Sequence, residues 1–503
     1  MGVLRPTAGL AEGLNKWRLH LAAACALMVV LGVAAVGGAD RQEVLRALEE
    51  QAESSGGADA GQRSSSSGIA LDQLQVDGAA SAGPGGPTSG RGASAAASSR
   101  ASGPSVRGAV YDQGVTDTEI RVGGSTFTSG PAAVYGEQIA VGFAAGVNYI
   151  NERGGINGRR VVLKIYDDGG DPAKQLANTK RLVEVDKVFA LAMSYAPIVG
   201  PYVLEQGVPV YHLGQFNEEF LHPWYFPVGG PQRTSAYQMA HFGSRVLDAK
   251  SVAIFYLDAG AVNYSRAYAE DVKKDWEAYG RSVPVLAPFA PDQTSCSDAI
   301  GQARDAGVDF IQFEIDAAKV INCGVEAQIQ GYKPPKGWGG YLIGVPVIHE
   351  ALGDYSIGMY AFDAFGANYD VPEYKEAVRR VSSKTESYSS VTASYFISAL
   401  LMRDSIGALG DNITRARVRD TINTFTDWTP GLTTHPNQPR WTWRPECHMA
   451  LKGGYVIQIQ KHDGELRWTQ IYPGPQTQYT HAYLPPGQSP PRDFADCKVF
   501  APG

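Results

Sequence analysis

The spacing of apolar residues changes repeatedly along the chain between residues 120 and 343. Short apolar runs, typical of buried parallel strands, alternate with segments whose apolar residues recur every three or four positions, as on one face of a helix. The predicted strands are 120–125, 161–166, 188–193, 208–211, 252–257, 283–286, 309–313 and 340–343. Two successive series of alternating strands and helices predict two α/β lobes, each with a parallel central sheet.

The predicted helices carry start and stop signals. One face of the first is apolar, at Ile139, Phe143, Val147 and Ile150. This helix ends at Gly154-Gly155, and Asp171-Pro172 gives the next one an N-cap and a proline at its first position. Later helices are predicted at 235–247, 264–279, 296–306, 317–330 and 391–409. Beyond residue 429 the pattern is less regular, and Asp463-Gly464 predicts a hairpin of strands 455–460 and 466–471.

The first 110 residues follow a different pattern. Residues 21–39 carry no charge, and Arg5, Lys16 and Arg18 precede them. This apolar run is long enough to span a bilayer as a helix, and the upstream charges predict a cytoplasmic N-terminus. A retained anchor in residues 1–40 is the favoured interpretation, and a signal peptide cleaved near 37–39 is the alternative. Lipidation at Cys25 is disfavoured because the apolar run continues past it, and each interpretation exports the rest of the chain.

Residues 41–110 contain no aromatic side chain and are rich in Ser, Gly and Ala. Such a segment buries too little apolar surface to offset its ordering entropy, so it is predicted to be a disordered tether. The tether either lets the folded part dock on a membrane partner or serves only as a spacer.

Composition narrows the function classes. Hydrophobic residues make up 44% of the chain and charged residues 19%, as in globular proteins. The net charge of -7 and the absence of a Lys/Arg cluster argue against nucleic acid as a partner. The four cysteines beyond Cys25 form no CxxC pair, and proximity predicts the disulfides Cys296–Cys323 and Cys447–Cys497, which suit an oxidising compartment. Free buried thiols are the alternative.

Signatures of catalysis are missing from the sequence. It has no Gly-x-Ser-x-Gly elbow, no His-Glu-x-x-His motif and no Gly-x-Gly-x-x-Gly after the first strand. The spacing of His435, His448 and His462 suits no standard metal site. The expectation is therefore a protein that is not an enzyme and needs no cofactor or metal. Paired carboxylates for glycoside chemistry cannot be recognised by spacing, so an exported hydrolase stays open.

Several turn and cap signals occur in a characteristic order: Ser129-Gly130-Pro131 with Gly136, then 151–158, Tyr166-Asp167-Asp168 and Asp171-Pro172. From about Thr116 to Gln460 the chain thereby resembles the type I periplasmic binding proteins, in the branch that serves branched-chain amino acid ABC transporters. The resemblance implies two Rossmann-like lobes joined by a hinge of three crossovers, near 229–232, 358–365 and 447–454. The first lobe would comprise 111–232 plus 359–446, and the second 233–358 plus 447–503.

The resemblance also implies a ligand site between the lobes. Ser194 and Tyr195 are expected to hold a ligand carboxylate, while Tyr135, beside the Ser129 loop, lines the wall. Tyr264 is expected to reach the ligand from the second lobe. Gln215 and Phe216 stand where the family uses a small residue and a threonine, which leaves polar anchoring there open.

An amino acid ligand would also need a carboxylate for its ammonium group, because an unpaired buried charge is costly. The family implies one just after Ile343, where this chain has Gly344-Val345-Pro346. Glu314 and Asp316 are the substitutes that the sequence offers. Each residue named for the site also has an ordinary explanation as a cap, a packing aromatic or a solvated carboxylate.

The expected function is that of an extracytoplasmic solute-binding protein, membrane-anchored or exported. It would capture an amino acid or related small organic solute between the lobes and deliver it to the permease subunits of an ABC-type importer. The alternatives are an exported ligand-sensing domain for a partner receptor and, third, an exported hydrolase.

Overall fold

The computed structural model describes residues 110–472, apart from 131–132, 194–196, 215–216, 231, 260–263, 342, 364–370, 383–388, 433–439 and 452–454. The predicted anchor, the predicted tether and Cys497 lie outside the described residues. Within the described ranges, no helix combines the length and apolarity needed to cross a bilayer.

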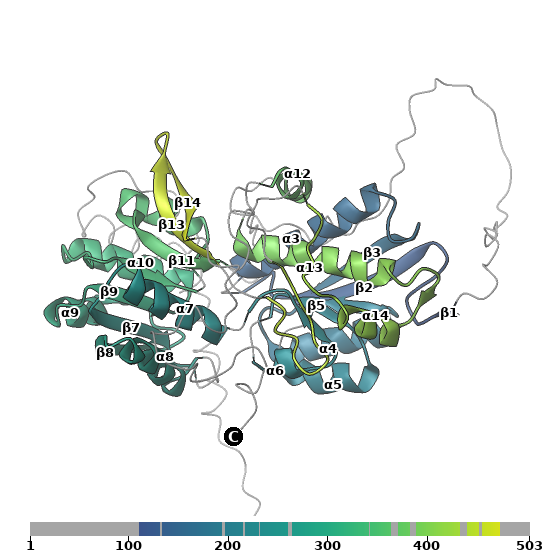
Figure 1. Ribbon diagram of the computed structural model, residues 1–503, viewed down its shortest axis with the longest axis horizontal. Helices are drawn as coiled ribbons and strands as arrows, with labels where there is room; N and C mark the ends of the chain where they lie inside the picture. The colour runs from purple at the N-terminus through teal and green to yellow at the C-terminus, as the bar shows by residue number, and fades with distance from the viewer. Residues whose placement is uncertain are drawn as a thin grey trace, which may run out of the picture.

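The first lobe is built on a five-stranded sheet, with strand order β3-β2-β4-β5-β6 and every pair parallel. Its strands are β2 (Glu119–Thr126), β3 (Arg160–Asp167), β4 (Ala190–Ala192), β5 (Val210–His212) and β6 (Tyr225–Pro227). Its helices are α3 (Ala133–Glu152), α4 (Pro172–Glu184), η3 (Pro197–Val199), α5 (Gly200–Gln206), α6 (Asn217–Leu221), α12 (Pro372–Val381), α13 (Ser390–Gly407) and α14 (Arg415–Ile422). Helices α3 and α13 lie side by side on one face of the sheet (Figure 1), and their buried side chains form much of the core of this lobe.

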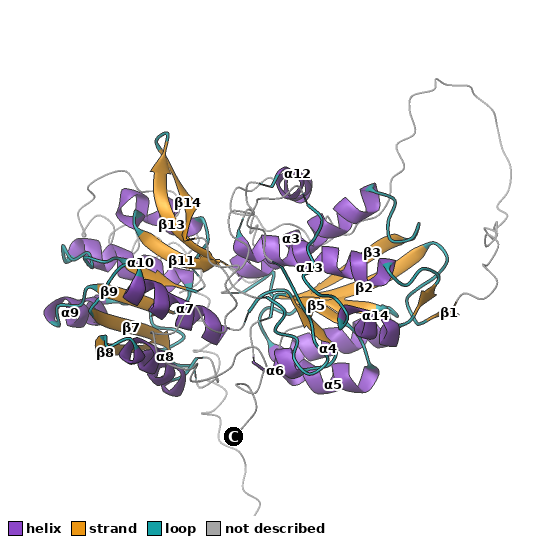
Figure 2. Cartoon of the chain, viewed as in Figure 1, coloured by secondary structure: helices purple, strands orange, loops and turns teal. Residues whose placement is uncertain are grey.

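The second lobe contains a seven-stranded sheet with the order β14-β13-β11-β10-β9-β7-β8. Strands β7 (Ser251–Leu257), β8 (Ser282–Phe289), β9 (Phe310–Glu314), β10 (Trp338–Gly340) and β11 (Met359–Asp363) are parallel, while β13 (Tyr455–His462) and β14 (Glu465–Tyr472) are antiparallel additions. Its helices are α7 (Gln232–Arg245), α8 (Arg266–Ala278), α9 (Ser297–Asp305), α10 (Ala317–Ile329), α11 (Val347–Leu352) and η4 (Gly353–Ser356). Helices flank the sheet of each lobe (Figure 2), so the expected α/β fold with two parallel-sheet lobes is confirmed.

The chain passes between the two sheets three times, after β6, after β11 and before β13. The second passage lies one strand later than the domain boundary expected at residue 358. Strand β11 is buried at all of its positions and pairs with β10 and β13, so it belongs to the second sheet and not to the first lobe. A short apolar strand buried on both faces carries no alternation by which its lobe could be assigned.

One of the two predicted disulfides is present: Cys296 bonds to Cys323 with a Cα–Cα distance of 4.9 Å, and it joins the start of α9 to α10. Cys447 is also disulfide-bonded. Its predicted partner, Cys497, lies outside the described residues, so that pairing remains a prediction.

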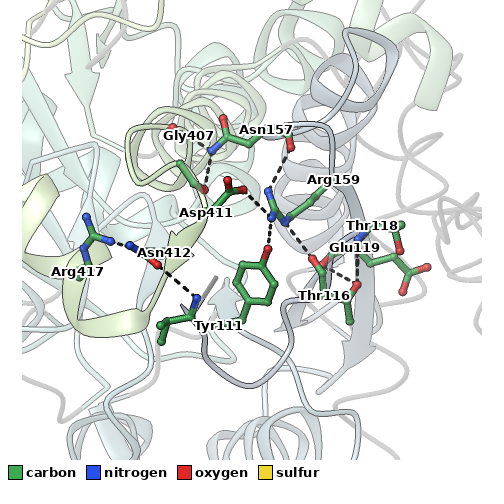
Figure 3. Close-up of polar contacts among 12 residues, drawn as sticks. Tyr111, Thr116, Thr118, Glu119, Asn157, Arg159, Gly407, Asp411, Asn412 and Arg417 are labelled. Carbon is green, nitrogen blue, oxygen red and sulfur yellow. Dashed lines mark hydrogen bonds and ion pairs between the residues drawn. The ribbon is translucent and has the colours of Figure 1, made fainter. Parts of the chain in front are cut away.

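The outer end of the first lobe is fixed by the buried side chain of Arg159, which is 3% exposed. Its guanidinium donates to the carbonyl of Thr116 at 2.9 Å, to the hydroxyl of Tyr111 at 2.5 Å and to Asp411 at 3.2 Å (Figure 3). Tyr111 ends β1 (Val110–Tyr111), and Asp411 precedes its parallel partner β12 (Asn412–Ile413). Arg159 therefore ties the first described residues to the turn that precedes β3.

The glycine-rich turn at 154–158, which contains Asn157, also holds the outer end of the first lobe together. Asn157 has a left-handed φ of 51°, and its side-chain amide donates to the carbonyls of Gly407 and Gly410 at 3.0 and 3.2 Å. Gly407 is the last residue of α13, so its carbonyl has no partner within the helix, and Gly410 lies in the turn that follows. This part of the family-like motif therefore joins the α3–β3 turn to α13, and it lies away from the junction of the lobes (Figure 1).

Candidate functional site between the lobes

Tyr135 joins the two lobes. It lies in the first turn of α3, after the carboxyl end of β2, and its hydroxyl accepts a hydrogen bond from the backbone N–H of Ala317 at 3.2 Å. Ala317 is the first residue of α10, just beyond the carboxyl end of β9. The Tyr135 ring packs against the core of the second lobe. The carboxyl ends of strands from both sheets therefore meet at this contact.

Tyr341 follows β10 in the second lobe. Its ring packs against the cluster that forms the core of the first lobe and that also includes Phe362 of β11, whose ring is 6.5 Å away. Burial raises the pKa of Tyr341, and Tyr264, Glu219 and Glu314 raise it further. The phenol is therefore neutral, and it lies within electrostatic reach of a carboxylate from each lobe. Sequence reasoning missed Tyr341 because it placed this residue inside a strand at 340–343.

Tyr264 lies in the loop after β7, where its carbonyl accepts the N–H of Ala259 at 2.9 Å. Its phenol is close enough to Tyr135 and Tyr341 to contribute to the raised pKa of each. Burial is the larger cause for both groups. The structure thus brings the predicted residues Tyr135 and Tyr264 together, and it adds Tyr341 to them.

Glu314 is a buried carboxylate, 3% exposed, at the carboxyl end of β9. It accepts hydrogen bonds from the side-chain amide of Gln312 at 2.7 Å, the hydroxyl of Tyr268 at 3.0 Å and the side-chain amide of Gln232 at 3.3 Å. Burial raises the pKa of Glu314, although the three hydrogen bonds and the charge of Arg233 oppose that shift. Since Gln232 is the first residue of α7, Glu314 also connects the first passage between the lobes to the second sheet.

Asp316 is the N-cap of α10. Its carboxylate accepts the backbone N–H of Lys319 at 3.0 Å and pairs with the Lys319 ammonium at 2.8 Å. The carboxylate also lies near Tyr135, whose pKa it raises in addition to the effect of burial. The capping interaction accounts for an Asp at this position without a ligand.

Ser129 is exposed, and its polar groups are engaged with Asp167. Its N–H and hydroxyl donate to the Asp167 carboxylate at 3.1 and 2.5 Å, and Gly169 N–H donates at 3.0 Å. Burial opposes the shift, but these hydrogen bonds and the charge of Lys174 lower the pKa of Asp167. Asp167 therefore satisfies donors at the strand end and holds the Ser129 loop.

The other predicted ligand contacts, Ser194, Tyr195, Gln215 and Phe216, lie outside the described residues. Met193, the residue before Ser194, is buried and has a left-handed φ of 65°. Strain of this kind in a bulky residue is concentrated at functional sites. Gly124 leaves room for the Met193 side chain in this conformation, because a Cβ at Gly124 would lie 2.5 Å from Met193 Cε.

His212 and Glu219 lie in the first lobe, and Glu219 is close enough to Tyr341 to raise its pKa. His212 ends β5, accepts the N–H of Gly214 on Nδ1 at 3.3 Å and points Nε2 toward Glu219, 3.8 Å away. Burial, with a smaller effect of His222, lowers the pKa of His212 to about 3, so the ring is neutral and Nε2 carries the proton. Across the described part of the chain, no three His, Cys, Asp or Glu side chains are grouped to hold a metal ion.

Two lobes of parallel strands meeting at their carboxyl ends define a type I periplasmic binding protein. The chain belongs to the periplasmic binding protein family, whose sequence profile matches residues 119–465. The resemblance expected from the sequence is thereby confirmed, and the family is one of extracytoplasmic solute-binding proteins.

Known relatives are distant. Leu/Ile/Val-binding protein homolog 3 of Brucella melitensis is 25% identical over 202 residues, covering 39% of this chain and 54% of that protein. The leucine-, isoleucine-, valine-, threonine-, and alanine-binding protein of Pseudomonas aeruginosa is 24% identical over 267 residues, covering 50% of this chain and 68% of that protein. The chain thus spans about half the length of several of the curated relatives it matches.

Solved structures share the fold. A solute-binding protein of an ABC transporter from R. palustris, in complex with 4-hydroxybenzoate, has a TM-score of 0.60 at 20% identity, covering 72% of this chain and 98% of that one. A leucine binding protein from Thermotoga maritima has a TM-score of 0.59 at 16% identity, covering 70% of this chain and 99% of that one.

Proposed function

We propose that the protein captures a small organic solute between its lobes and delivers it, chemically unchanged, to an ABC-type importer. The contact of Tyr135, which reaches from the first lobe to Ala317 and the core of the second, carries this proposal. Ligands of open α/β sheets bind outside the carboxyl ends of the strands, and here two such ends meet. Movement about the three connecting passages would open and close the site.

The proposed ligand contacts are the residues that the sequence singled out, together with Tyr341. They are Ser129, Tyr135, Ser194, Tyr195, Gln215, Phe216, Tyr264, Glu314, Asp316 and Tyr341. Ser129 and Asp316 already have hydrogen-bond partners within the protein, so each would have to share them in order to contact a solute. Tyr135, Tyr264 and Tyr341 are the strongest candidates because they lie together between the lobes.

The ligand class remains to be chosen by experiment. The names of the relatives mention leucine, isoleucine and valine, and one structural neighbour binds 4-hydroxybenzoate. We further propose that residues 21–39 attach the protein to the membrane and that permease subunits receive the solute. An exported sensing domain would bind its ligand in the same way, and adjacent permease and ATPase genes would favour transport.

Thermal melts of the full-length protein in mild detergent, against a library of amino acids, amines and aromatic or aliphatic acids, test the capture of a solute. We expect one chemical class to raise Tm by about 2–4 °C at saturating concentration. Hydrogen exchange of the peptide containing Ala317 should slow with the same solute, because its N–H lies at the junction of the lobes. The absence of both effects for every solute would contradict capture, and conversion of the stabilising solute would indicate a hydrolase.

A pair of tyrosine variants locates the site. Tyr264→Ala should abolish the ligand-induced shift in Tm. Tyr332→Ala is the matched control, because the Tyr332 hydroxyl donates to the carbonyl of Val308 at the opposite, amino end of β9. Both variants are expected to be less stable than the parent without ligand, but only Tyr332→Ala should retain the shift.

A further inference from the structure

Three neighbouring elements of the first lobe carry exposed hydrophobic side chains. Ile198 on η3 is 48% exposed, Leu204 on α5 is 52% exposed, and Leu221 at the end of α6 is 40% exposed. The ring of His222, the residue after Leu221, lies 3.0 Å from the carbonyl oxygen of Gly200 and holds the end of α6 against the start of α5 (Figure 1). These three hydrophobic residues form the apolar face of the lobe. Exposed apolar groups on adjoining elements mark a surface that another segment or molecule covers.

Cys447 lies beside this apolar face. The residue after it, His448, donates its backbone N–H to the carbonyl of Phe220 at 2.8 Å. Phe220 belongs to α6 and directly precedes Leu221. Cys447 itself is 2% exposed and disulfide-bonded. A segment joined to Cys447 would therefore be held next to α6.

The partner of Cys447 belongs to a terminal part of the chain. The chain has five cysteines, and Cys296 and Cys323 are bonded to each other. The remaining two are Cys25 and Cys497. Cys25 falls within the proposed membrane segment 21–39, and a cysteine inside the bilayer cannot bond to one packed in a folded lobe. Cys497 is therefore the partner that the chain offers.

The C-terminal segment, residues 473–503, begins close enough to reach Cys447. Tyr472, the last residue of β14, pairs with Val456 in β13. Residues 452–454 separate β13 from Leu451, which lies in the core of the first lobe. The segment therefore leaves the second lobe at the junction. Residues 473–496 span roughly 25–30 Å as a flexible chain and up to about 80 Å when extended, which is enough to arrive at Cys447.

Apolar residues stand on both sides of Cys497 in the sequence. Phe494 precedes it, and Val499 and Phe500 follow it. A disulfide holds the Cα atoms of its two cysteines about 5.5–6 Å apart, so a bond to Cys447 would place these side chains next to α6 and the apolar face. Contact between the two apolar sets would remove both from water.

We propose that the C-terminal segment crosses from the second lobe to the first, where a disulfide between Cys497 and Cys447 fastens it and its apolar residues cover the apolar face. The bond forms by oxidation of two thiols, whose two electrons and two protons pass to a disulfide oxidant outside the cytoplasm. The segment is then a fourth connection between the lobes, in addition to the three passages of the chain.

Peptide mapping of the non-reduced, full-length protein by mass spectrometry tests the bond. We expect the peptide containing Cys447 to be linked to the peptide containing Cys497, in a protein that migrates as a monomer on a non-reducing gel. A Cys447 peptide that is linked to Cys25, linked to a second copy of the chain, or free would overturn the proposal.

Trypsin tests whether the fastened segment is docked. It cleaves after Arg492 and Lys498, which lie on either side of Cys497. Both cleavages should be at least tenfold faster in Cys497→Ser than in the parent. The double variant Cys296→Ser, Cys323→Ser is the matched control, because it removes the other disulfide and should leave both rates unchanged well below its Tm. Equal rates in Cys497→Ser and the parent would overturn the proposal.

A substitution in the apolar face separates docking from simple tethering. Leu204→Ser should speed the same two cleavages at least threefold and should speed hydrogen exchange of the α5 peptide. Ile329→Ser is the control, because Ile329 is 49% exposed on α10 in the second lobe and should affect neither. If Leu204→Ser behaves like the parent, the segment does not cover this face and the proposal is overturned. A parent dimer that Leu204→Ser dissociates would assign the face to a second copy, and would overturn it as well.

Discussion

The hydroxyl of Tyr135 in the first lobe accepts a hydrogen bond from the backbone N–H of Ala317 in the second, at 3.2 Å. Ala317 begins α10, and the first N–H groups of a helix have no partner within it. The bond therefore satisfies a donor that would otherwise need water, and it does so across the junction of the lobes. Opening of the lobes must break it.

Removing that hydroxyl should loosen the junction. Tyr135→Phe is expected to lower the free energy of unfolding by about 1 kcal/mol, the usual value for one hydrogen bond, and to speed hydrogen exchange of the peptide containing Ala317. Tyr332→Phe removes a hydroxyl bonded within the second lobe and should leave exchange at Ala317 unchanged. Equal exchange in Tyr135→Phe and the parent would show that the bond does not hold the lobes together.

Gly136 allows the helix α3 to start close to the loop that follows β2. A Cβ at this position would lie 2.0 Å from the carbonyl oxygen of Phe127, so Gly136→Ala must displace the backbone that carries Tyr135. We expect a loss of about 2 kcal/mol or more in stability and a weaker ligand-induced shift in Tm.

Gly301→Ala is the control for that substitution. Gly301 lies inside α9, where a Cβ would approach only Gln330 Oε1, at 3.8 Å. Alanine is the better helix former, so this variant should be about 0.5–1 kcal/mol more stable. Denaturant unfolding measures both variants, and similar effects of the two would contradict the steric argument.

The disulfide between Cys296 and Cys323 closes a loop of 27 residues in the second lobe. In the chain-entropy treatment, a loop of this length stabilises the fold by roughly 3–4 kcal/mol. The double variant Cys296→Ser, Cys323→Ser should unfold at correspondingly lower denaturant concentration, and a reducing agent should then have less effect than on the parent. An unchanged midpoint would mean that the bond contributes little.

Acid should destabilise the first lobe through His212. Burial lowers the pKa of His212 to about 3 in the folded protein, whereas the unfolded value is about 6.5. The unfolded state therefore binds the extra proton between these values, and stability falls as the pH is lowered from 6.5 toward 3. His212→Gln should reduce the slope of unfolding free energy against pH by up to about 1.4 kcal/mol per unit in this window. An identical slope in the variant would show that His212 is not responsible.

Regular elements were predictable where their signals are local. Asp171 caps α4 by accepting the N–H groups of Ala173 and Lys174, as its position before Pro172 predicted. The Asp463-Gly464 turn joins β13 to β14, and both residues have the positive φ that a two-residue hairpin turn requires.

Strand β10 was predicted at 340–343 and lies at 338–340. Its Gly339 and Gly340 have low strand propensity, but a Cβ at Gly340 would lie 2.2 Å from the carbonyl oxygen of Phe313. Packing at the centre of the sheet therefore requires glycine, whereas glycine in a sequence normally predicts the end of a strand. This shift is also why Tyr341, at the strand end, was missed.

The site itself was predictable only in outline. Tyr135 and Tyr264 follow predicted strands, and a position after a parallel strand indicates the edge of the sheet at which ligands bind. Two hydrogen bonds to Glu314 come from Gln232 and Tyr268, which are 82 and 46 residues away in the chain. No local sequence pattern predicts that these residues come together in the fold.

The Arg159 cluster determines where the polypeptide enters the fold. Val110 and Tyr111 pair with β12 at the tip of the first lobe that is farthest from the second (Figure 1). A pull transmitted through the residues before Val110 would be borne by Arg159 and its partners, within one lobe. Attachment at that tip would therefore leave the two lobes free to open and close relative to each other.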